Sequence, residues 1–302
     1  MNRLIGIASH AILLSLLTLP LPCNSDDGQA KLADIHLHWK WNQKEVTTPK
    51  QAIDILRDNN VTLGVVTGTP PELALELHRL APDIVIPIYG VYQDGIDWFN
   101  WYHDEELLGR VRLALQSGSY RGIGELHMIS GFVSDWKNPN ISGLFEIAAE
   151  FDVPVLVHTE FSRADYLIGF CNAHPKTRFL WAHAGSVLPP GEVTRALRHC
   201  ANLSVELSAR DPWRHVARRI DEGGVLKAGW RDLVIAYANR VMIGSDPVWP
   251  VERLNPWDEA DTGWQELSRF LDFHRQWLKQ MPADVARRVR YENAYEYFRK
   301  QP

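Results

Sequence analysis

Residues 153–158 read Val-Pro-Val-Leu-Val-His, an almost wholly apolar run that ends in a histidine. A strand that is apolar at nearly every position is typical of a parallel sheet buried on both faces, because a half-exposed strand alternates polar and apolar side chains. The following stretch, 162–173, has the pattern of an amphipathic helix. A buried strand followed by a helix is the repeating unit of an α/β fold.

The same unit recurs along the whole chain. Further β-like runs lie at 33–38, 61–67, 84–89, 122–126, 178–183, 203–207 and 241–245. Helical stretches lie between them at 49–60, 71–80, 105–116, 142–150, 192–200 and 226–238. Eight strands that alternate with helical stretches in about 270 residues predict a (β/α)8 TIM barrel, a fold that typically needs about 250 residues. Residues 282–299 predict an additional C-terminal helix.

A doubly wound open sheet is the alternative fold. That fold carries a glycine-rich phosphate-binding turn after its first strand, whereas here the first strand ends in His36-Leu37-His38-Trp39. No internal repeat or low-complexity linker divides residues 31–302, so we expect one domain. Two long insertions, 91–104 and 247–263, follow strands and are therefore expected at the C-terminal face of the barrel, where such folds carry their sites.

The N-terminal 30 residues predict a secretory signal peptide. Arg3 precedes an apolar run at 4–21, and a polar stretch follows, with cleavage expected after Ser25 or Ala30. A membrane anchor is the alternative, but the strongest apolar core, 11–21, is short for a membrane span. The sequence therefore predicts an exported protein, periplasmic or secreted, that is not membrane-bound after cleavage.

The three cysteines are too few for a disulfide framework. Pro22 before Cys23 is a poor match to a lipoprotein signal, so lipidation is not favoured. Cys171 and Cys200 fall in predicted helices, which favours helix packing or one disulfide over a nucleophilic role.

The overall composition is that of an ordinary globular protein, with 45% hydrophobic and 23% charged residues. The formal net charge of −5 offers no basic surplus to hold a phosphate backbone, so nucleic acid is not expected as a partner. The expected partner is a small-molecule substrate, and assembly into a homo-oligomer is left open.

Ionisable residues interrupt the apolar strands near their C-terminal ends, which all reach one face of a barrel. They are His36, His38, Glu125, His158, His183 and Asp246. Side chains two apart on a strand point the same way, so the two histidines of the first strand share a side. Each residue alone is weak evidence, but charges that converge in a buried place need compensation, and a metal ion supplies it.

These motifs resemble the amidohydrolase superfamily, and in particular its amidohydrolase-related branch. The resemblance rests on His36-x-His38, Gly-Ile-Gly-Glu125-Leu-His, Val-Leu-Val-His158-Thr, Trp-Ala-His183-Ala-Gly and Ile-Gly-Ser-Asp246-Pro, in that order, and on the closing Asn293-Ala294 helix. It covers essentially all of residues 31–302. The resemblance implies a TIM-barrel enzyme, a metal-dependent hydrolase.

The resemblance also implies a ligand set. His36, His38 and Asp246 would hold one ion, and His158 and His183 would bind a second. Glu125 would bridge the two, which favours a binuclear site. The alternative is a single ion, with His158 joining the first site, His183 orienting water or substrate, and Glu125 as a supporting carboxylate.

The expected chemistry follows from a divalent ion, which lowers the pKa of bound water to about 7 and polarises a carbonyl or phosphoryl oxygen. Asp246 would orient the attacking water, accept its proton and pass it to the leaving group. Zn²⁺ is the expected metal, as one or two ions, and Mn²⁺, Fe²⁺ or Ni²⁺ suit the same donors.

The predicted function is hydrolysis of a small ester, lactone, amide or phosphoester. The alternatives are a metal-dependent decarboxylase or lactonase of the same superfamily, and a non-catalytic exported metal-binding protein. Arg163 and Arg210 follow strands and are candidate contacts for a substrate carboxylate, and His127 is a further candidate substrate contact. Several tryptophans fall after strands, where they would either line an aromatic substrate pocket or pack the loops: Trp39, Trp41, Trp98, Trp101, Trp136, Trp213, Trp249 and Trp257.

Overall fold

The structure is a computed structural model that describes residues 30–95, 97–128, 138–214, 218–250 and 259–299. Residues Lys31–Pro302 form one compact unit, and the description below concerns that unit. The predicted signal peptide, up to residue 29, lies outside the described residues. Among the described helices, none combines the length and the apolar character that crossing a membrane requires.

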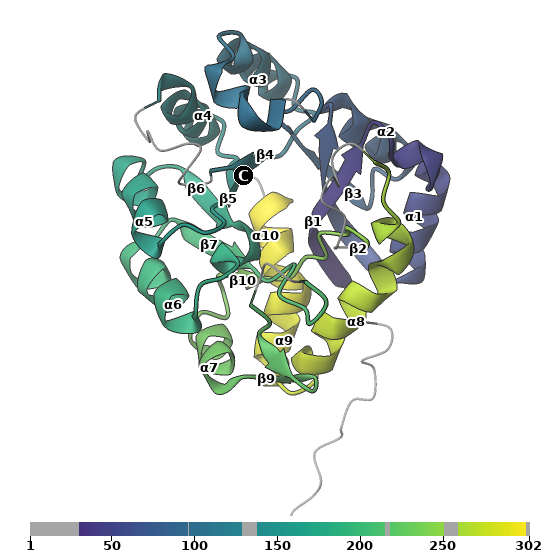
Figure 1. The fold of residues 1–302 in the computed structure, drawn as a ribbon, viewed down its shortest axis with the longest axis vertical. Coiled ribbons are helices and arrows are strands. Elements are labelled where there is room, and N and C mark those ends of the chain that lie inside the picture. Colours follow the sequence, from purple (N-terminus) through teal and green to yellow (C-terminus); the bar gives the residue numbers. More distant parts are fainter. Residues whose placement is uncertain (1–29, 96, 129–137, 215–217, 251–258, 300–302) are drawn as a thin grey trace, which may run out of the picture. The chain divides into compact units, whose positions relative to one another are not determined.

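Eight parallel strands form the centre of the unit (Figure 1). They are β1 (Leu32–Lys40), β2 (Val61–Thr69), β3 (Val85–Ile88), β4 (Ile123–His127), β5 (Pro154–His158), β6 (Arg178–Trp181), β7 (Leu203–Glu206) and β10 (Val241–Met242). Hydrogen bonding runs in the order β1-β2-β3 and, in a second sheet, β10-β7-β6-β5-β4. Both seams between the sheets are bridged, by Tyr89 paired with Ile123 and by the amide of Asp246 donating to the carbonyl of His36 at 2.8 Å. The strands thus close into the predicted (β/α)8 barrel.

Helices surround the strands and follow them in chain order (Figure 1). They are α1 (Pro49–Asp58), α2 (Glu72–Leu80), α3 (Leu107–Gln116), α4 (Pro139–Glu150), α5 (Ala164–Ala173), α6 (Pro190–His199), α7 (Ala228–Ala236) and α8 (Leu267–Leu278). The helix α1 begins at Pro49 because the N-cap residue Thr48 forms a capping box with Gln51 in the first turn. The helix α8, which the sequence pattern did not single out, completes the ring.

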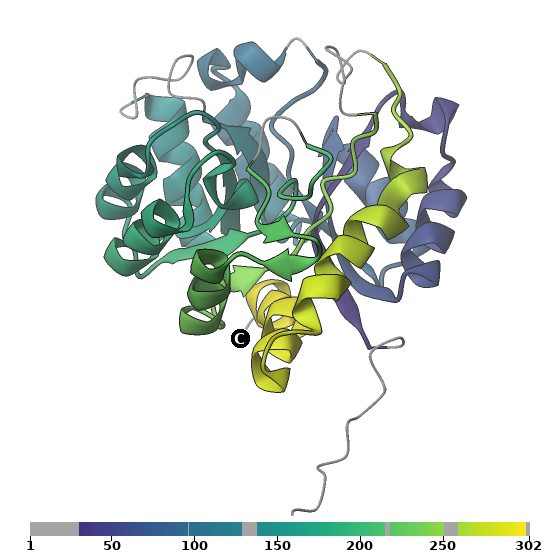
Figure 2. The same cartoon turned by 60° about the horizontal axis from the view of Figure 1, so that its bottom comes forward.

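The predicted C-terminal helix is present and contains a π-helical turn. It consists of α9 (Ala283–Arg287), a π-helical turn (Arg288–Glu292) and α10 (Asn293–Phe298). Figure 2 shows this segment below the barrel, at the end opposite the loops that follow the strands. Ala294 and Phe298 of α10 join the apolar cluster inside the barrel, so this segment closes its base.

An irregularity in β1 places the polar side chains of this strand on the inner side of the barrel. The pairing of β1 with β2 shifts register between Asp34 and Leu37. Ala33 before the shift and Ile35 within it pack in the apolar cluster inside the barrel, whereas Leu37 and Trp39 beyond it pack in the outer core. Alternation then places His36, His38 and Lys40 on the inner side at the mouth.

Two smaller features complete the fold. A two-stranded hairpin, β8 (Asp221–Glu222) and β9 (Val225–Leu226), turns through Gly223 and Gly224, both with positive φ, as a tight two-residue turn requires. Cys171 on α5 and Cys200, directly after α6, are buried free cysteines. Their location agrees with the predicted helix-packing role.

Candidate metal centre

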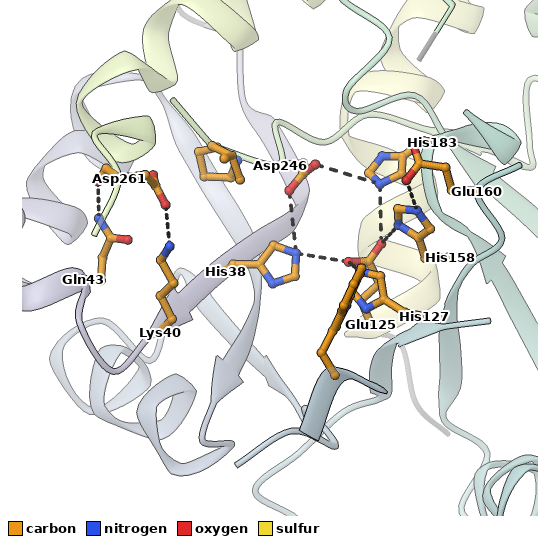
Figure 3. A pocket seen from close by; sticks show the side chains of 13 residues that line it. His38, Lys40, Gln43, Glu125, His127, His158, Glu160, His183, Asp246 and Asp261 are labelled. Carbon is orange, nitrogen blue, oxygen red and sulfur yellow. Dashed lines mark hydrogen bonds and ion pairs between the residues drawn. The ribbon is translucent and has the colours of Figure 1, made fainter. Parts of the chain in front are cut away.

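A cavity opens at the C-terminal ends of the strands, and the predicted ionisable residues converge on it (Figure 3). Its lining comprises His38, Lys40, Gln43, Trp98, Glu125, His127, His158, Glu160, His183, Asp246, Pro247, Val248 and Asp261. His36 lies directly beneath, with its Nε2 atom 3.0 Å from Nε2 of His38. All six residues predicted to form the metal site are therefore brought together.

The Glu125 carboxylate lies at the centre of the cluster. Its Oε2 atom lies 3.4 Å from Nε2 of His36 and 3.3 Å from Nε2 of His38. Its Oε1 atom lies 2.8 Å from Nδ1 of His158 and 3.5 Å from Nε2 of His183. Each carboxylate oxygen thus faces a different pair of imidazoles.

These separations fit a metal centre. Two ligands of one tetrahedral ion, each about 2.0–2.2 Å from it, lie about 3.4 Å apart. Three overlapping groups of side chains each bring one ligand atom per residue within 4.8 Å of one another. They are His36, His183 and Asp246; His36, His38 and Glu125; and Glu125, His127 and His158. The donor set is mixed imidazole and carboxylate, which suits first-row divalent cations.

Asp246 enters the cluster from the end of the last strand. Its Oδ1 atom lies 3.7 Å from Nε2 of His38, and its Oδ2 atom lies 3.3 Å from the Arg214 guanidinium. Burial alone would raise the pKa of Asp246, but His36, Arg214 and the neighbouring imidazoles lower it to about 2. The carboxylate is therefore ionised at neutral pH and can accept a proton or bind a cation.

The backbone at the two strand ends is unusual. His183 (φ 54°) and Asp246 (φ 46°) both adopt the left-handed conformation, which non-glycine residues rarely take. Such residues cost free energy and concentrate at functional sites, where the surrounding structure holds them. Gly244 allows the last strand to approach β1, because a Cβ there would lie 2.7 Å from Cβ of His36.

Hydrogen bonds fix the outer side of three imidazoles. Nδ1 of His36 lies 2.9 Å from Glu206, and Nε2 of His158 lies 3.2 Å from Glu160. Nδ1 of His183 lies 2.8 Å from Oγ of Ser208. Ligating histidines are typically held in this way, with one ring nitrogen bonded outward and the other left for the metal.

Sequence reasoning missed Glu206, the fully buried carboxylate at the end of β7. It accepts hydrogen bonds from His36, from the amide of His183 at 2.7 Å and from the amide of Ser208 at 2.6 Å. Burial would raise the pKa of Glu206, but the charge and hydrogen bond of His36, with the other donors, lower it to about 2. The signal was available, since Glu206 is a carboxylate inside an otherwise apolar strand end.

Glu206 is therefore expected to control metal affinity without touching the metal. Glu206→Gln keeps the side-chain size but removes the charge that holds the imidazole of His36, so we expect affinity for Zn²⁺ to fall about 10- to 100-fold. Chelator-competition titration measures this, with the exposed Glu222→Gln as matched control. Equal affinities for both variants and the parent protein would contradict this role for Glu206.

The second feature that sequence reasoning missed is a polar group at the far end of the cavity. Lys40 forms an ion pair with Asp261 at 3.0 Å, and the amide of Gln43 donates to the carbonyl oxygen of Asp261 at 2.9 Å (Figure 3). Lys40 shares its strand face with His36 and His38, so alternation along β1 could have identified it.

Neither of the two arginines predicted as substrate contacts is among the residues that line this cavity. Arg163 precedes α5 with its side chain 84% exposed, and it pairs with Asp165 rather than lining the cavity. Arg210 is fully buried and donates to the carbonyl oxygens of His183 and Ala184 at 2.7 and 2.8 Å. These hydrogen bonds hold the loop after β6 and occupy donors of the guanidinium, so Arg210 is not placed to bind a substrate carboxylate. His127, in contrast, lines the cavity as predicted.

The tryptophans divide between the two alternatives. Trp98 lines the cavity, next to the ring of His127 at a centroid distance of 5.0 Å. Trp39 and Trp101 are buried in the outer core, and Trp213 and Trp249 both stack with Arg269. Trp41 is partly exposed, and Trp136 and Trp257 lie outside the described residues. Most of the described set therefore packs the loops rather than lining the cavity.

Protonation of the cluster predicts pH-dependent metal binding. Burial would lower the pKa of His158, but Glu125 and Glu160 raise it to about 10, and carboxylates likewise raise the pKa of His36. The metal-free site therefore holds these protons at neutral pH, and a metal must displace them.

We accordingly expect affinity for Zn²⁺ to rise steeply with pH between about pH 6 and about pH 9, by roughly tenfold per pH unit for each displaced proton. Calorimetry in buffers of different ionisation enthalpy counts the protons released. Binding without proton release at neutral pH would contradict the protonation of His36 and His158.

Comparison with known proteins gives a consistent result. The family model described as Amidohydrolase matches residues 103–300. A comparison with curated protein sequences gives no match.

Among solved structures, dihydroorotase from Campylobacter jejuni is similar with a TM-score of 0.59 and 15% identity, over 89% of this chain and 84% of that one. An amidohydrolase from Burkholderia multivorans with bound zinc has a TM-score of 0.51 and 16% identity, over 88% and 98%. A dihydroxybenzoic acid decarboxylase from a Polaromonas species, with bound manganese and the inhibitor 2-nitroresorcinol, has a TM-score of 0.53 and 9% identity, over 89% and 96%. At these identities the likeness establishes the fold.

Proposed function

This chain belongs to the amidohydrolase family of metal-dependent enzymes, and we propose that it hydrolyses a small carbonyl or phosphoryl compound at a binuclear metal centre. The proposed ligands are His36, His38 and Asp246 for one ion and His158 and His183 for the other, with Glu125 bridging both.

The geometry of Glu125 carries the proposal. One of its oxygens lies within 3.4 Å of Nε2 of both His36 and His38, and the other lies within 3.5 Å of ring nitrogens of both His158 and His183. A carboxylate that only supported one imidazole would need one such contact. A carboxylate that would serve two cations needs imidazole nitrogens near both of its oxygens, and Glu125 has this arrangement.

When bound, the cations lower the pKa of a water molecule and polarise the substrate oxygen. The protein's own contribution is proton transfer by Asp246. Its pKa of about 2 keeps it ionised, and the Arg214 guanidinium at 3.3 Å holds Oδ2. Oδ1 faces His36 and His38 at the cavity floor. It is thereby placed to accept a proton from the attacking water and to return it to the leaving group.

Zn²⁺ is the proposed metal, because imidazole and carboxylate donors at these separations suit it, and Mn²⁺ is the first alternative. The similar structures with bound zinc and manganese support both choices.

The cavity favours a small substrate with an uncharged end. Trp98 offers an apolar wall, and at the opposite end the ammonium of Lys40 is neutralised by Asp261 at 3.0 Å. An ester or lactone fits this lining better than a compound with two carboxylates.

Metal-depleted protein reloaded with Zn²⁺ or Mn²⁺ tests the proposal. The panel contains p-nitrophenyl acetate, a δ-lactone, a cyclic amide, p-nitrophenyl phosphate and a hydroxybenzoate. We expect hydrolysis that chelation abolishes and metal restores. Release of CO2 from the hydroxybenzoate alone would favour the decarboxylase instead, and loading without any turnover would favour the non-catalytic metal-binding protein.

Export is a separate proposal, based on the Arg3-led apolar run at 4–21. N-terminal sequencing of the protein from its native host is expected to begin near Asp26 or Lys31. An intact Met1 on a cytosolic species would contradict export.

A further inference from the structure

His127 differs from the other imidazoles of the cluster in how it is held. It follows Glu125 by two positions on β4 and lines the same cavity. Its Nε2 atom lies 3.5 Å from Oε2 of Glu125, and the group of Glu125, His127 and His158 is compact enough to hold a cation. Distance alone therefore makes His127 a candidate ligand, and its hydrogen bonds decide whether it is one.

The proposed ligands keep an outward-facing N–H. A carboxylate can only accept, so Nδ1 of His36 donates to Glu206, and Nε2 of His158 donates to Glu160. The inner nitrogens, Nε2 of His36 and Nδ1 of His158, are thus the positions at which a metal can replace a proton.

His183 follows the same rule. The hydroxyl of Ser208 donates its one proton to Glu206 at 2.9 Å, so its oxygen accepts from Nδ1–H of His183 at 2.8 Å. The inner nitrogen, Nε2, is again the one left for a metal.

His127 has the opposite arrangement, because its outer partner is the hydroxyl of Tyr92. That oxygen already accepts the backbone N–H of His127 at 2.9 Å, and it also lies 2.8 Å from Nδ1 of the same residue. If Nδ1 carried the proton, the buried phenol hydrogen would have no acceptor in the part of the chain that the structure describes, which is costly. The phenol therefore donates to Nδ1, and the ring proton is on Nε2.

We propose that His127 donates its Nε2–H to a substrate oxygen rather than binding a metal ion, with Tyr92 as the residue that fixes its tautomer. This inference rests on the proposed function. Negative charge develops on the carbonyl or phosphoryl oxygen during attack by water, and a fixed N–H directed into the cavity stabilises it. Trp98 packs edge-on against the ring and limits its rotation.

Zinc content and imidazole tautomer test the assignment without any substrate. His127→Ala is expected to keep the zinc content of the parent protein, whereas the matched His158→Ala loses zinc. In ¹⁵N-histidine spectra of the zinc-loaded protein, the resonances removed by His127→Gln should show a protonated Nε2 and an unprotonated Nδ1, and Tyr92→Phe should shift them. Loss of zinc in His127→Ala, or a protonated Nδ1, would overturn the proposal.

Kinetics test the donor role. On the panel compound turned over fastest, His127→Ala should lower kcat by about 10²-fold, the loss expected for one donor to a developing oxyanion, with zinc content retained. His127→Gln, which places an amide N–H near the same point, should recover part of that loss. Unchanged kcat in zinc-replete His127→Ala would rule out the donor role. If no panel compound is turned over, the proposed function fails, and zinc content and tautomer still decide whether His127 is a ligand.

Discussion

Asp246→Asn is expected to lower kcat by at least about 10²-fold, the scale of losing a positioned general base, while the protein stays folded. Asparagine keeps the size of the side chain and an oxygen for Arg214, whose other bond to this residue, at 2.7 Å, goes to the backbone carbonyl. The substitution removes the ionised carboxylate. The amide oxygen of asparagine does not accept a proton at neutral pH, so it cannot act as the general base.

The rate must be compared at equal metal content, because Asp246 is also a proposed ligand. Measuring kcat and zinc per chain for Asp246→Asn and for the exposed Asp232→Asn separates the two roles. Near-normal turnover in folded, zinc-loaded Asp246→Asn would contradict its role in proton transfer.

The second large effect concerns neighbouring residues of β1. His38→Ala should lose metal and activity with a smaller loss of stability in the metal-free protein than Leu37→Ala, since its side chain, 17% exposed, is less deeply buried. Leu37→Ala should instead keep metal and lower the free energy of unfolding by roughly 2–5 kcal/mol, because Leu37 is fully buried in the outer core.

The comparison uses bound metal and chemical denaturation of the metal-free proteins, with the exposed Leu113→Ala as control for the leucine change. His36→Ala should lose metal as well, but it also leaves Glu206 buried without its partner, so its stability is less informative. Full metal content in His38→Ala would contradict the inward orientation of the polar face of β1.

The barrel could be predicted from sequence because its strands are apolar throughout and its polar residues stand at their ends. The predicted runs at 33–38 and 61–67 fall inside β1 and β2, and the run at 153–158 begins one residue before β5. The register shift in β1 could not be predicted, because residues before and after it have the same apolar and polar alternation. The hairpin at Gly223-Gly224 had a turn signal, but its strands are only two residues each.

The candidate site was predictable where chemistry depends on residue type and strand position, as for His36 and Asp246. The site was not predictable where a residue's role depends on the direction in which its side chain points. Arg210 follows β7 much as His158 ends β5, yet its guanidinium turns toward the backbone carbonyls of His183 and Ala184 after β6. Glu206 interrupts an apolar strand, but its role depends on His36 and His183, which belong to other segments that only the closed barrel brings next to it.

The number of metal ions per chain, with and without Glu125, tests the central claim most directly. Elemental analysis of the zinc-loaded parent protein is expected to give about two ions per chain, because each oxygen of Glu125 faces its own pair of imidazoles. Glu125→Gln, which keeps the size but removes the charge, should reduce this to about one or less. A firm value of one ion per chain that Glu125→Gln leaves unchanged would contradict the bridged binuclear centre and favour the single-ion alternative.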